Sequence, residues 1–162
     1  MKNLLLSTAL LLLLSFYSQA QKNPELPSDW KLISGCTVSV YAPSDIEFKE
    51  DNSSDTCLRE YQGKSISMMI YVTPFNIGSD EYSNWLEYCV LKTEIQTRKA
   101  EIVTSYIPVN SGRNDGLDFT AMLLVPQFRT GDGNLIIRVW GKTPENRDRG
   151  IKILESAQFD MK

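Results

Sequence analysis

Hydrophobic and polar residues alternate along several short segments of the chain, and such alternation predicts strands with one buried face. Trp30 and Leu32 are expected to begin the core. In residues 36–41 the apolar side chains of Cys36, Val38 and Val40 share one face, and Pro43 ends the segment. Further strands are predicted where similar patterns lie between turn-forming residues. These strands cover residues 57–61, 65–73, 100–107, 117–125 and 135–140.

Two other segments follow the helical period. The first runs from Glu81 to about Lys92, and its apolar stripe consists of Tyr82, Trp85, Leu86 and Cys89. These four positions lie three or four residues apart, as on one helix face. The second helix begins at Thr143-Pro144, because threonine suits the N-cap and proline the first helical position. Its apolar stripe consists of Ile151, Leu154 and Ala157.

The segments between these elements are rich in turn-forming or charged residues. Residues 44–56 are acidic and are predicted to form a long surface connection, while Gly63-Lys64 marks a hairpin turn. Turn clusters also occupy residues 110–116 and 131–134. Strands joined by tight turns favour antiparallel pairing. The predicted fold class is therefore α+β, with helices packed on an antiparallel sheet.

The first twenty residues differ from the rest of the chain and resemble a secretory signal peptide. Lys2 precedes an apolar run from Leu4 to Leu14, and small residues end the segment at Ala20. The apolar run is about half the length that a spanning helix needs, although a retained anchor is the alternative. We expect cleavage after Ala20, a polar N-terminal arm over residues 21–28, and one globular domain over residues 29–162. The mature protein would then be secreted or periplasmic and would not span the membrane.

Composition narrows the chemistry that the chain can perform. The sequence contains no histidine, so it lacks the base of Ser-His-Asp and Cys-His sites and the usual histidine ligands of zinc. The formal net charge of −3 becomes −4 when Lys2 is removed with the leader. This mildly acidic balance argues against nucleic-acid binding. We expect no metal and no cofactor, and a protein that is not an enzyme.

Three cysteines, Cys36, Cys57 and Cys89, remain in the mature chain. In an oxidising compartment two of them are expected to pair. Cys36 and Cys57 begin predicted strands and flank the acidic connection, so a bridge between them would restrain that connection. Cys89 lies on the predicted helical stripe and is expected to remain a buried free thiol. Three reduced core cysteines are the alternative.

Carboxylates and an asparagine offer weaker candidates. Asp115, Asp118 and Asp132 lie in predicted turns, where a calcium loop is conceivable. The spacing does not fit an EF-hand, and turn formation alone explains these residues. Asn52 begins a glycosylation sequon that matters only in a eukaryotic host.

Basic residues gather toward the C-terminus. Arg138, Lys142, Arg147 and Arg149 are candidates for an anion patch beside the N-terminus of the last helix. Acidic residues are interleaved with them, so an ordinary solvated helix face is the alternative.

Three segments together resemble a known fold family. They are Trp30 followed by a strand ending in Tyr41-Ala42-Pro43-Ser44, the segment Ala100–Tyr106, and the closing helix that ends in residues 153–159. Their spacing is similar to that of PsbP, the extrinsic subunit of photosystem II, and its bacterial relatives. The resemblance implies an α-β-α sandwich around an antiparallel sheet. It implies no activity and transfers no functional residue.

Three classes of function remain after these exclusions. The first is a non-enzymatic domain that binds an unknown protein or small ligand, favoured because no catalytic motif is present. The second is an inhibitor or immunity-type interaction partner, which an exposed apolar or acidic patch would favour. The third is a carboxylate-based hydrolase, which two carboxyl groups in a deep pocket would favour.

Overall fold

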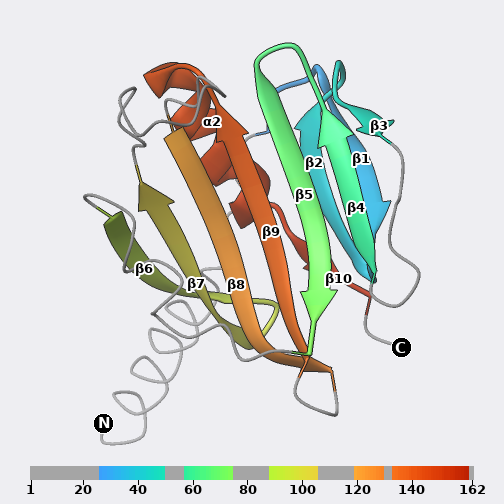
Figure 1. The fold of residues 1–162 in the computed structure, drawn as a ribbon, viewed down its shortest axis with the longest axis vertical. Coiled ribbons are helices and arrows are strands. Elements are labelled where there is room, and N and C mark those ends of the chain that lie inside the picture. Colours follow the sequence, from blue (N-terminus) through green and yellow to red (C-terminus); the bar gives the residue numbers. More distant parts are fainter. Residues whose placement is uncertain (1–25, 50–56, 75–87, 106–118, 130–132, 161–162) are drawn as a thin grey trace, which may run out of the picture.

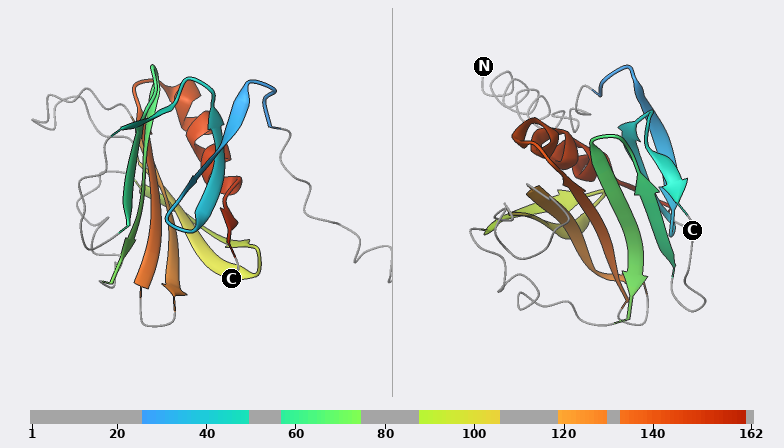
Figure 2. Two further views of the ribbon diagram at one scale, coloured as in Figure 1. Left: turned by 90° about the vertical axis from the view of Figure 1, so that its right-hand side faces the viewer. Right: turned by 45° about the horizontal axis from the view of Figure 1, so that its top comes forward.

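The computed structural model describes residues 26–49, 57–74, 88–105, 119–129 and 133–160. Within these ranges, two antiparallel sheets and one helix form two layers (Figure 1). A seven-stranded sheet is one layer. The helix and a three-stranded sheet lie side by side on one of its faces and form the other layer (Figure 2).

The three-stranded sheet joins the two ends of the domain. Its strands are β1 (Trp30–Gly35), β2 (Val38–Pro43) and β10 (Gln158–Phe159), in the order β1-β2-β10. Both pairings are antiparallel. The central strand β2 is almost completely buried, so it forms the inner part of this layer.

The seven-stranded sheet is antiparallel throughout and has the order β3-β4-β5-β9-β8-β7-β6. Its edges are β3 and β6. In chain order the strands are β3 (Glu47–Lys49), β4 (Leu58–Gln62), β5 (Ile66–Thr73), β6 (Tyr88–Ile95), β7 (Arg98–Ser105), β8 (Phe119–Arg129) and β9 (Gly133–Gly141). The α+β class with an antiparallel sheet is thus confirmed, with sheet predominating over helix.

The helix α2 (Pro144–Glu155) begins where the sequence predicts, with Thr143 at the N-cap and proline in the first turn. The Thr143 side chain makes no capping hydrogen bond to the backbone. At the other end, the Ser156 hydroxyl donates to the carbonyl of Ile153 at 2.7 Å and accepts from the amide of Tyr41 at 2.9 Å. Ser156 therefore ends the helix and attaches it to β2.

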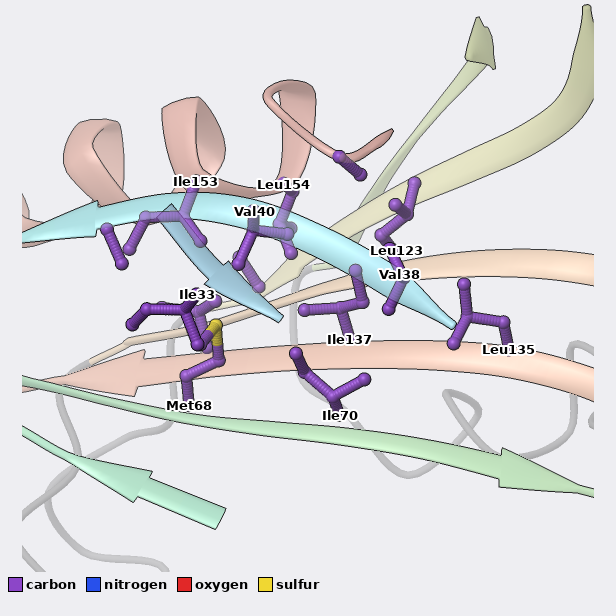
Figure 3. Packing of buried hydrophobic residues seen from close by; sticks show 14 of the residues in the cluster. Ile33, Val38, Val40, Met68, Ile70, Leu123, Leu135, Ile137, Ile153 and Leu154 are labelled. Atoms are coloured by element: carbon purple, nitrogen blue, oxygen red, sulfur yellow. The ribbon is translucent and has the colours of Figure 1, made fainter. Parts of the chain in front are cut away.

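The main hydrophobic core lies between the two layers (Figure 3). Val38 and Val40 of β2 face Ile70 and Ile137 of the large sheet, while Ile153 and Leu154 of α2 pack beside β2. A smaller cluster of Val103, Met122, Leu124 and Ile136 occupies the opposite face of the large sheet. Strands β8 and β9 are therefore buried on both faces, which explains their nearly continuous apolar sequences.

The predicted helix from Glu81 to Lys92 is wrong in its C-terminal part, because residues 88–95 form strand β6. The hairpin with β7 pairs Tyr88 with Ser105 and Ile95 with Arg98. Gln96 and Thr97, which connect the two strands, both have positive φ angles, as in the tight turns that suit a twisted hairpin. Residues 81–87 lie outside the described ranges.

Three further expectations need correction. The acidic connection of residues 44–56 contains a short strand, β3, at its start. Strand β8 does not stop at Pro126, because a bulge between Val125 and Arg129 accommodates the proline. Leu32, expected in the core, is half exposed, whereas its neighbour Ile33 is buried.

Several sequence predictions lie outside the described residues. They concern the signal segment of residues 1–20, most of the arm, Asn52, and the turn residues Asp115, Asp118 and Asp132. Leu26, at the end of the arm, packs partly buried against the main core. Among the described helices, none is long and apolar enough to cross a membrane.

Candidate functional site

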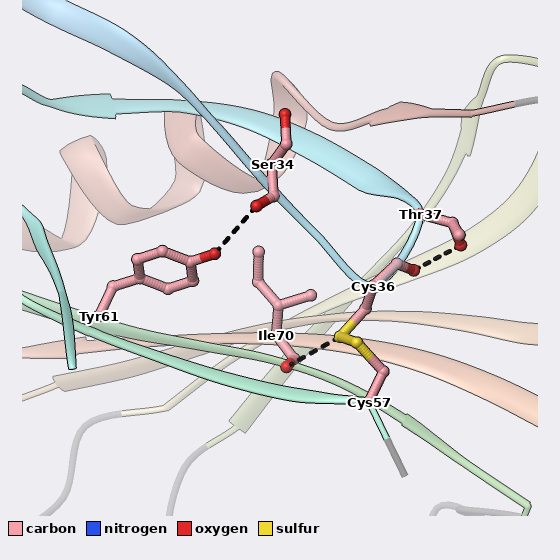
Figure 4. Close-up of a disulfide and its surroundings, with 6 residues drawn as sticks. All are labelled: Ser34, Cys36, Thr37, Cys57, Tyr61 and Ile70. Atoms are coloured by element: carbon pink, nitrogen blue, oxygen red, sulfur yellow. Dashed lines mark hydrogen bonds between the residues drawn. A yellow bond between two sulfur atoms is a disulfide. The ribbon is translucent and has the colours of Figure 1, made fainter. Parts of the chain in front are cut away.

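A disulfide joins the two layers at one end of the domain. Cys36, in the turn between β1 and β2, is bonded to Cys57 at the start of β4, and their Cα atoms lie 5.4 Å apart (Figure 4). This pairing is the one predicted from the sequence. The Sγ of Cys36 also lies 3.6 Å from the carbonyl oxygen of Ile70. The bridge fixes the end of β1 against the sheet edge formed by β3 and β4.

A cleft of about 610 Å³ opens between that part of β1 and the β3–β4 edge. Its volume lies within the usual range of ligand sites. We call it the β1–β3 cleft. Eleven described residues line it: Lys31, Leu32, Ile33, Ser34, Gly35, Cys36, Ile46, Glu47, Phe48, Arg59 and Tyr61.

Tyr61 crosses the inner end of the β1–β3 cleft. Its hydroxyl donates a hydrogen bond to the carbonyl oxygen of Ser34 at 3.1 Å, so it links β4 to β1 (Figure 4). Burial raises the pKa of Tyr61 above its ordinary value, while the positive charge of Arg59 opposes this rise. A Cβ at Gly35 would lie only 2.8 Å from this hydroxyl, so glycine is required for the close approach of the two strands.

The outer rim of the cleft combines apolar and cationic groups. Leu32 and Phe48 are each about half exposed. The Phe48 ring meets the edge of Tyr61 at 5.7 Å between centroids, and the Arg59 guanidinium lies 5.5 Å from its centre. Lys31 adds a second cation and donates to the carbonyl of Ser44 at 2.9 Å. The described lining of the cleft thus holds two cations and one carboxylate, Glu47, in a chain of negative net charge.

Replacing Tyr61 by phenylalanine should lower the free energy of unfolding by about 1 kcal/mol near pH 7, because the Ser34 carbonyl loses its donor. The folded-state pKa of Tyr61 is raised, so its stabilising contribution is complete below its ordinary value of 10.0 and is lost as the pH rises through the folded-state value. Urea unfolding of both proteins from pH 7 to pH 11 should therefore show a difference that shrinks at high pH. A difference that stays constant over this range would contradict the assignment.

The four basic residues of the predicted anion patch are not brought together. Arg138 lies on β9 opposite Met122, on the face of the sheet that α2 does not cover. Its guanidinium packs over Trp140 and donates to the Thr120 hydroxyl. Arg147 and Arg149 belong to α2 on the other face, and Lys142 lies in the connection between β9 and α2. Alternation along β9 therefore separates Arg138 from the helix.

Cys89 remains a free thiol, as predicted, but the expectation of burial is wrong. It lies exposed on β6 because this segment forms an edge strand and not a helix. Within the described ranges, no three side chains of the histidine, cysteine, aspartate or glutamate type are grouped for a metal ion.

The sequence pattern does not predict the β1–β3 cleft. Phe48 lies among charged residues, and its alternation with Ile46 is a single apolar pair, too short to predict a strand. The pairing of Phe48 with Tyr61 across β3 and β4 could have been inferred only from the aromatic character of both residues.

Comparisons with known proteins add little to this geometry. No family profile and no curated protein sequence matches the chain. Among solved structures, the fold is similar to the Ran-binding protein Mog1p of Saccharomyces cerevisiae, with 7% sequence identity and a TM-score of 0.49. The match covers 81% of this chain and 95% of Mog1p. The protein is thus an antiparallel α+β domain with a surface cleft beside a disulfide.

Proposed function

We propose that the protein is an exported, non-enzymatic binding domain whose β1–β3 cleft receives an extended segment of a partner protein. The cleft carries this proposal, because two edge strands flank it and two exposed apolar side chains, Leu32 and Phe48, form its rim. An extended segment suits such a site since strand edges offer unused backbone hydrogen-bonding groups. The disulfide and the signal-like leader support export.

The chemistry of the rim indicates which segment would fit. An apolar side chain of the partner would lie between Leu32 and Phe48, where it would remove exposed apolar surface from water. An acidic group beside it would face Arg59 and Lys31. The Ser34 carbonyl already accepts from Tyr61, so the segment would pair with the outer part of β1, near Lys31 and Leu32.

Selection from a phage-displayed library of random linear peptides tests this proposal on residues 21–162. We expect enriched peptides to combine an apolar residue with an acidic one and to bind more weakly as salt concentration rises. Leu32→Ser and Phe48→Ser should each weaken binding about tenfold. Leu91→Ser is the matched control, because Leu91 is 54% exposed and Leu32 is 50% exposed. Peptides that bind both rim variants as tightly as the unaltered protein would contradict the assignment, and so would a library without enrichment.

The two other classes of function make different use of the cleft. A carboxylate-based hydrolase needs two carboxyl groups, whereas Glu47 is the single carboxylate among the described lining residues. An inhibitor or immunity-type protein would cover its partner with a broad surface, and peptides would then compete poorly with the folded partner. The same peptide selection therefore separates the leading proposal from both.

We also propose that the fold is related to the PsbP-like sandwich. Its support is the closing helix packed on an antiparallel sheet, and it agrees with a non-catalytic role because that fold is mostly non-catalytic. Superposition of an experimental structure on a solved PsbP subunit would test it.

A further inference from the structure

Strand β6 is an edge of the large sheet with an unusually apolar exposed surface. It is the last strand in the sheet order, and its outer side faces no described strand. Tyr88, Val90 and Leu91 are all exposed on it, as is Cys89. Most edge strands carry charges, prolines or bulges that discourage pairing with another chain. Strand β6 has no proline, and its pairing with β7 is regular over its whole length.

Each charged residue of β6 lies opposite a residue of the other sign on the neighbouring strand β7. Lys92 lies opposite Glu101 of β7, and Glu94 lies opposite Lys99. A strand added to the outer side of β6 would therefore not need to supply counter-charges. It would need to cover apolar side chains on both faces of the sheet, since Leu91 lies on the side of the main core and Tyr88 and Val90 lie on the other.

We propose that β6 pairs antiparallel with β6 of a second copy of this chain, about a two-fold axis that passes beside Leu91. The pairing unites the two large sheets edge to edge. Leu91 contacts Leu91 of the second copy, Cys89 lies opposite Thr93, Val90 opposite Lys92, and Tyr88 opposite Glu94.

The register follows from the sequence of the strand. In an antiparallel pair, two residues that lie directly opposite each other point to the same face of the sheet. A two-fold axis perpendicular to the sheet therefore passes between two copies of the same residue. Centring on Leu91 pairs every residue from Tyr88 to Glu94 and places no like charges directly opposite. Centring on Lys92 would oppose two lysines, which is destabilising. Centring on Val90 or Thr93 pairs fewer of the residues of β6, whose bounds are Tyr88 and Ile95.

The dimer should be weak and dependent on concentration. A single edge-to-edge strand pair buries less surface than the interfaces of stable complexes, which bury about 1,200–2,000 Å². Sedimentation velocity of residues 21–162 at 0.15 M salt, in a non-reducing buffer that keeps the Cys36–Cys57 bridge intact, should therefore show monomer at low concentration. The weight-average mass should rise toward twice the monomer value as concentration increases. Monomer at every concentration would overturn the proposal.

A pair of charge variants at Leu91 tests the register itself. Leu91→Lys and Leu91→Glu should each remain monomeric, because like charges would lie directly across the axis. An equimolar mixture of the two should form a heterodimer. Leu32→Lys, at a similarly exposed position on the opposite side of the domain, should dimerise as the unaltered protein does. Failure of the mixture to associate would contradict the Leu91-centred pairing.

Cys89 provides an independent readout. It faces the second copy in this register, so its alkylation by iodoacetamide should slow several-fold as the protein concentration rises. Cys89→Ser should still dimerise, because the pairing uses the backbone and the apolar side chains. Loss of dimer in this variant would show that an intermolecular disulfide, and not the proposed pairing, joins the two copies.

Discussion

Replacing Cys36 and Cys57 together by alanine should lower the free energy of unfolding by about 3 kcal/mol. Cys57 lies 21 positions after Cys36 in the sequence, and the bridge restricts the unfolded chain by closing this loop. The loss is a large fraction of the stability of a domain of this size. It should appear as a lower midpoint of urea unfolding.

Cys89→Ala is the matched control, because it removes an exposed cysteine that forms no bridge. It should change the free energy of unfolding by less than about 0.5 kcal/mol. Intact mass of the protein exported by its native host checks that the Cys36–Cys57 bridge is present and that the chain begins at Gln21. Equal stabilities of the double variant and the control would show that the bridge contributes nothing.

Phe119→Ala should destabilise the domain by about 3–5 kcal/mol. Phe119 is fully buried at the start of β8. Its ring lies against Gly141 and Gly150, where an added Cβ would approach ring carbons at 2.7 Å and 3.1 Å. These glycines have no side chains that could move into the space left by the ring, so a cavity would remain. The loss should be visible in thermal and urea unfolding alike.

Phe48→Ala provides the comparison for this experiment. The same atoms are removed there, but Phe48 is 53% exposed, so water fills the space and no cavity forms. The expected loss is about 1 kcal/mol, from its contacts with Tyr61 and Arg59. Similar losses in the two variants would mean that Phe119 is not enclosed as the structure indicates.

The elements that pack against the main core were predictable from the sequence. In α2 the Thr143-Pro144 pair marks the start and Leu154 of the predicted stripe is fully buried, although the helix ends at Glu155, before Ala157. In β5, alternation places Ile66, Met68 and Ile70 on one face. These signals are strong because each residue on the buried face contributes to the pattern.

The predicted helix was wrong at β6 because a short apolar stripe can fit both the helical period and the strand period. Tyr88 to Ile95 is rich in residues that favour strands, yet Trp85, Leu86 and Cys89 also match a helical face. The hairpin turn after β6, Gln96-Thr97, contains neither glycine nor asparagine, the residues that usually indicate such a turn. Both Gln96 and Thr97 nevertheless adopt positive φ angles. The pairing with β7 therefore determines the conformation here. The predicted burial of Cys89 failed together with the helix.

The β1–β3 cleft could not be predicted because its walls are distant in the sequence. The turn residues Cys36 and Thr37 both have positive φ angles, and this turn brings the end of β1 toward β4. The disulfide was predictable from the positions of the cysteines along the chain. The contact of Tyr61 with Ser34 depends on how the two sheets are layered, which alternation along single strands does not specify.

The short strand β10 determines when this domain can complete its folding. Strand β2 pairs with β1 on one side and with β10 on the other, and the amides of Phe159 and Asp160 donate to Gln96 Oε1 and the Thr37 carbonyl. Any process that delivers the chain from its N-terminus, on a ribosome or through a translocation pore, releases β1 and β2 first and β10 last. The three-stranded sheet therefore stays incomplete, with one side of β2 open, until residues 158–160 have emerged.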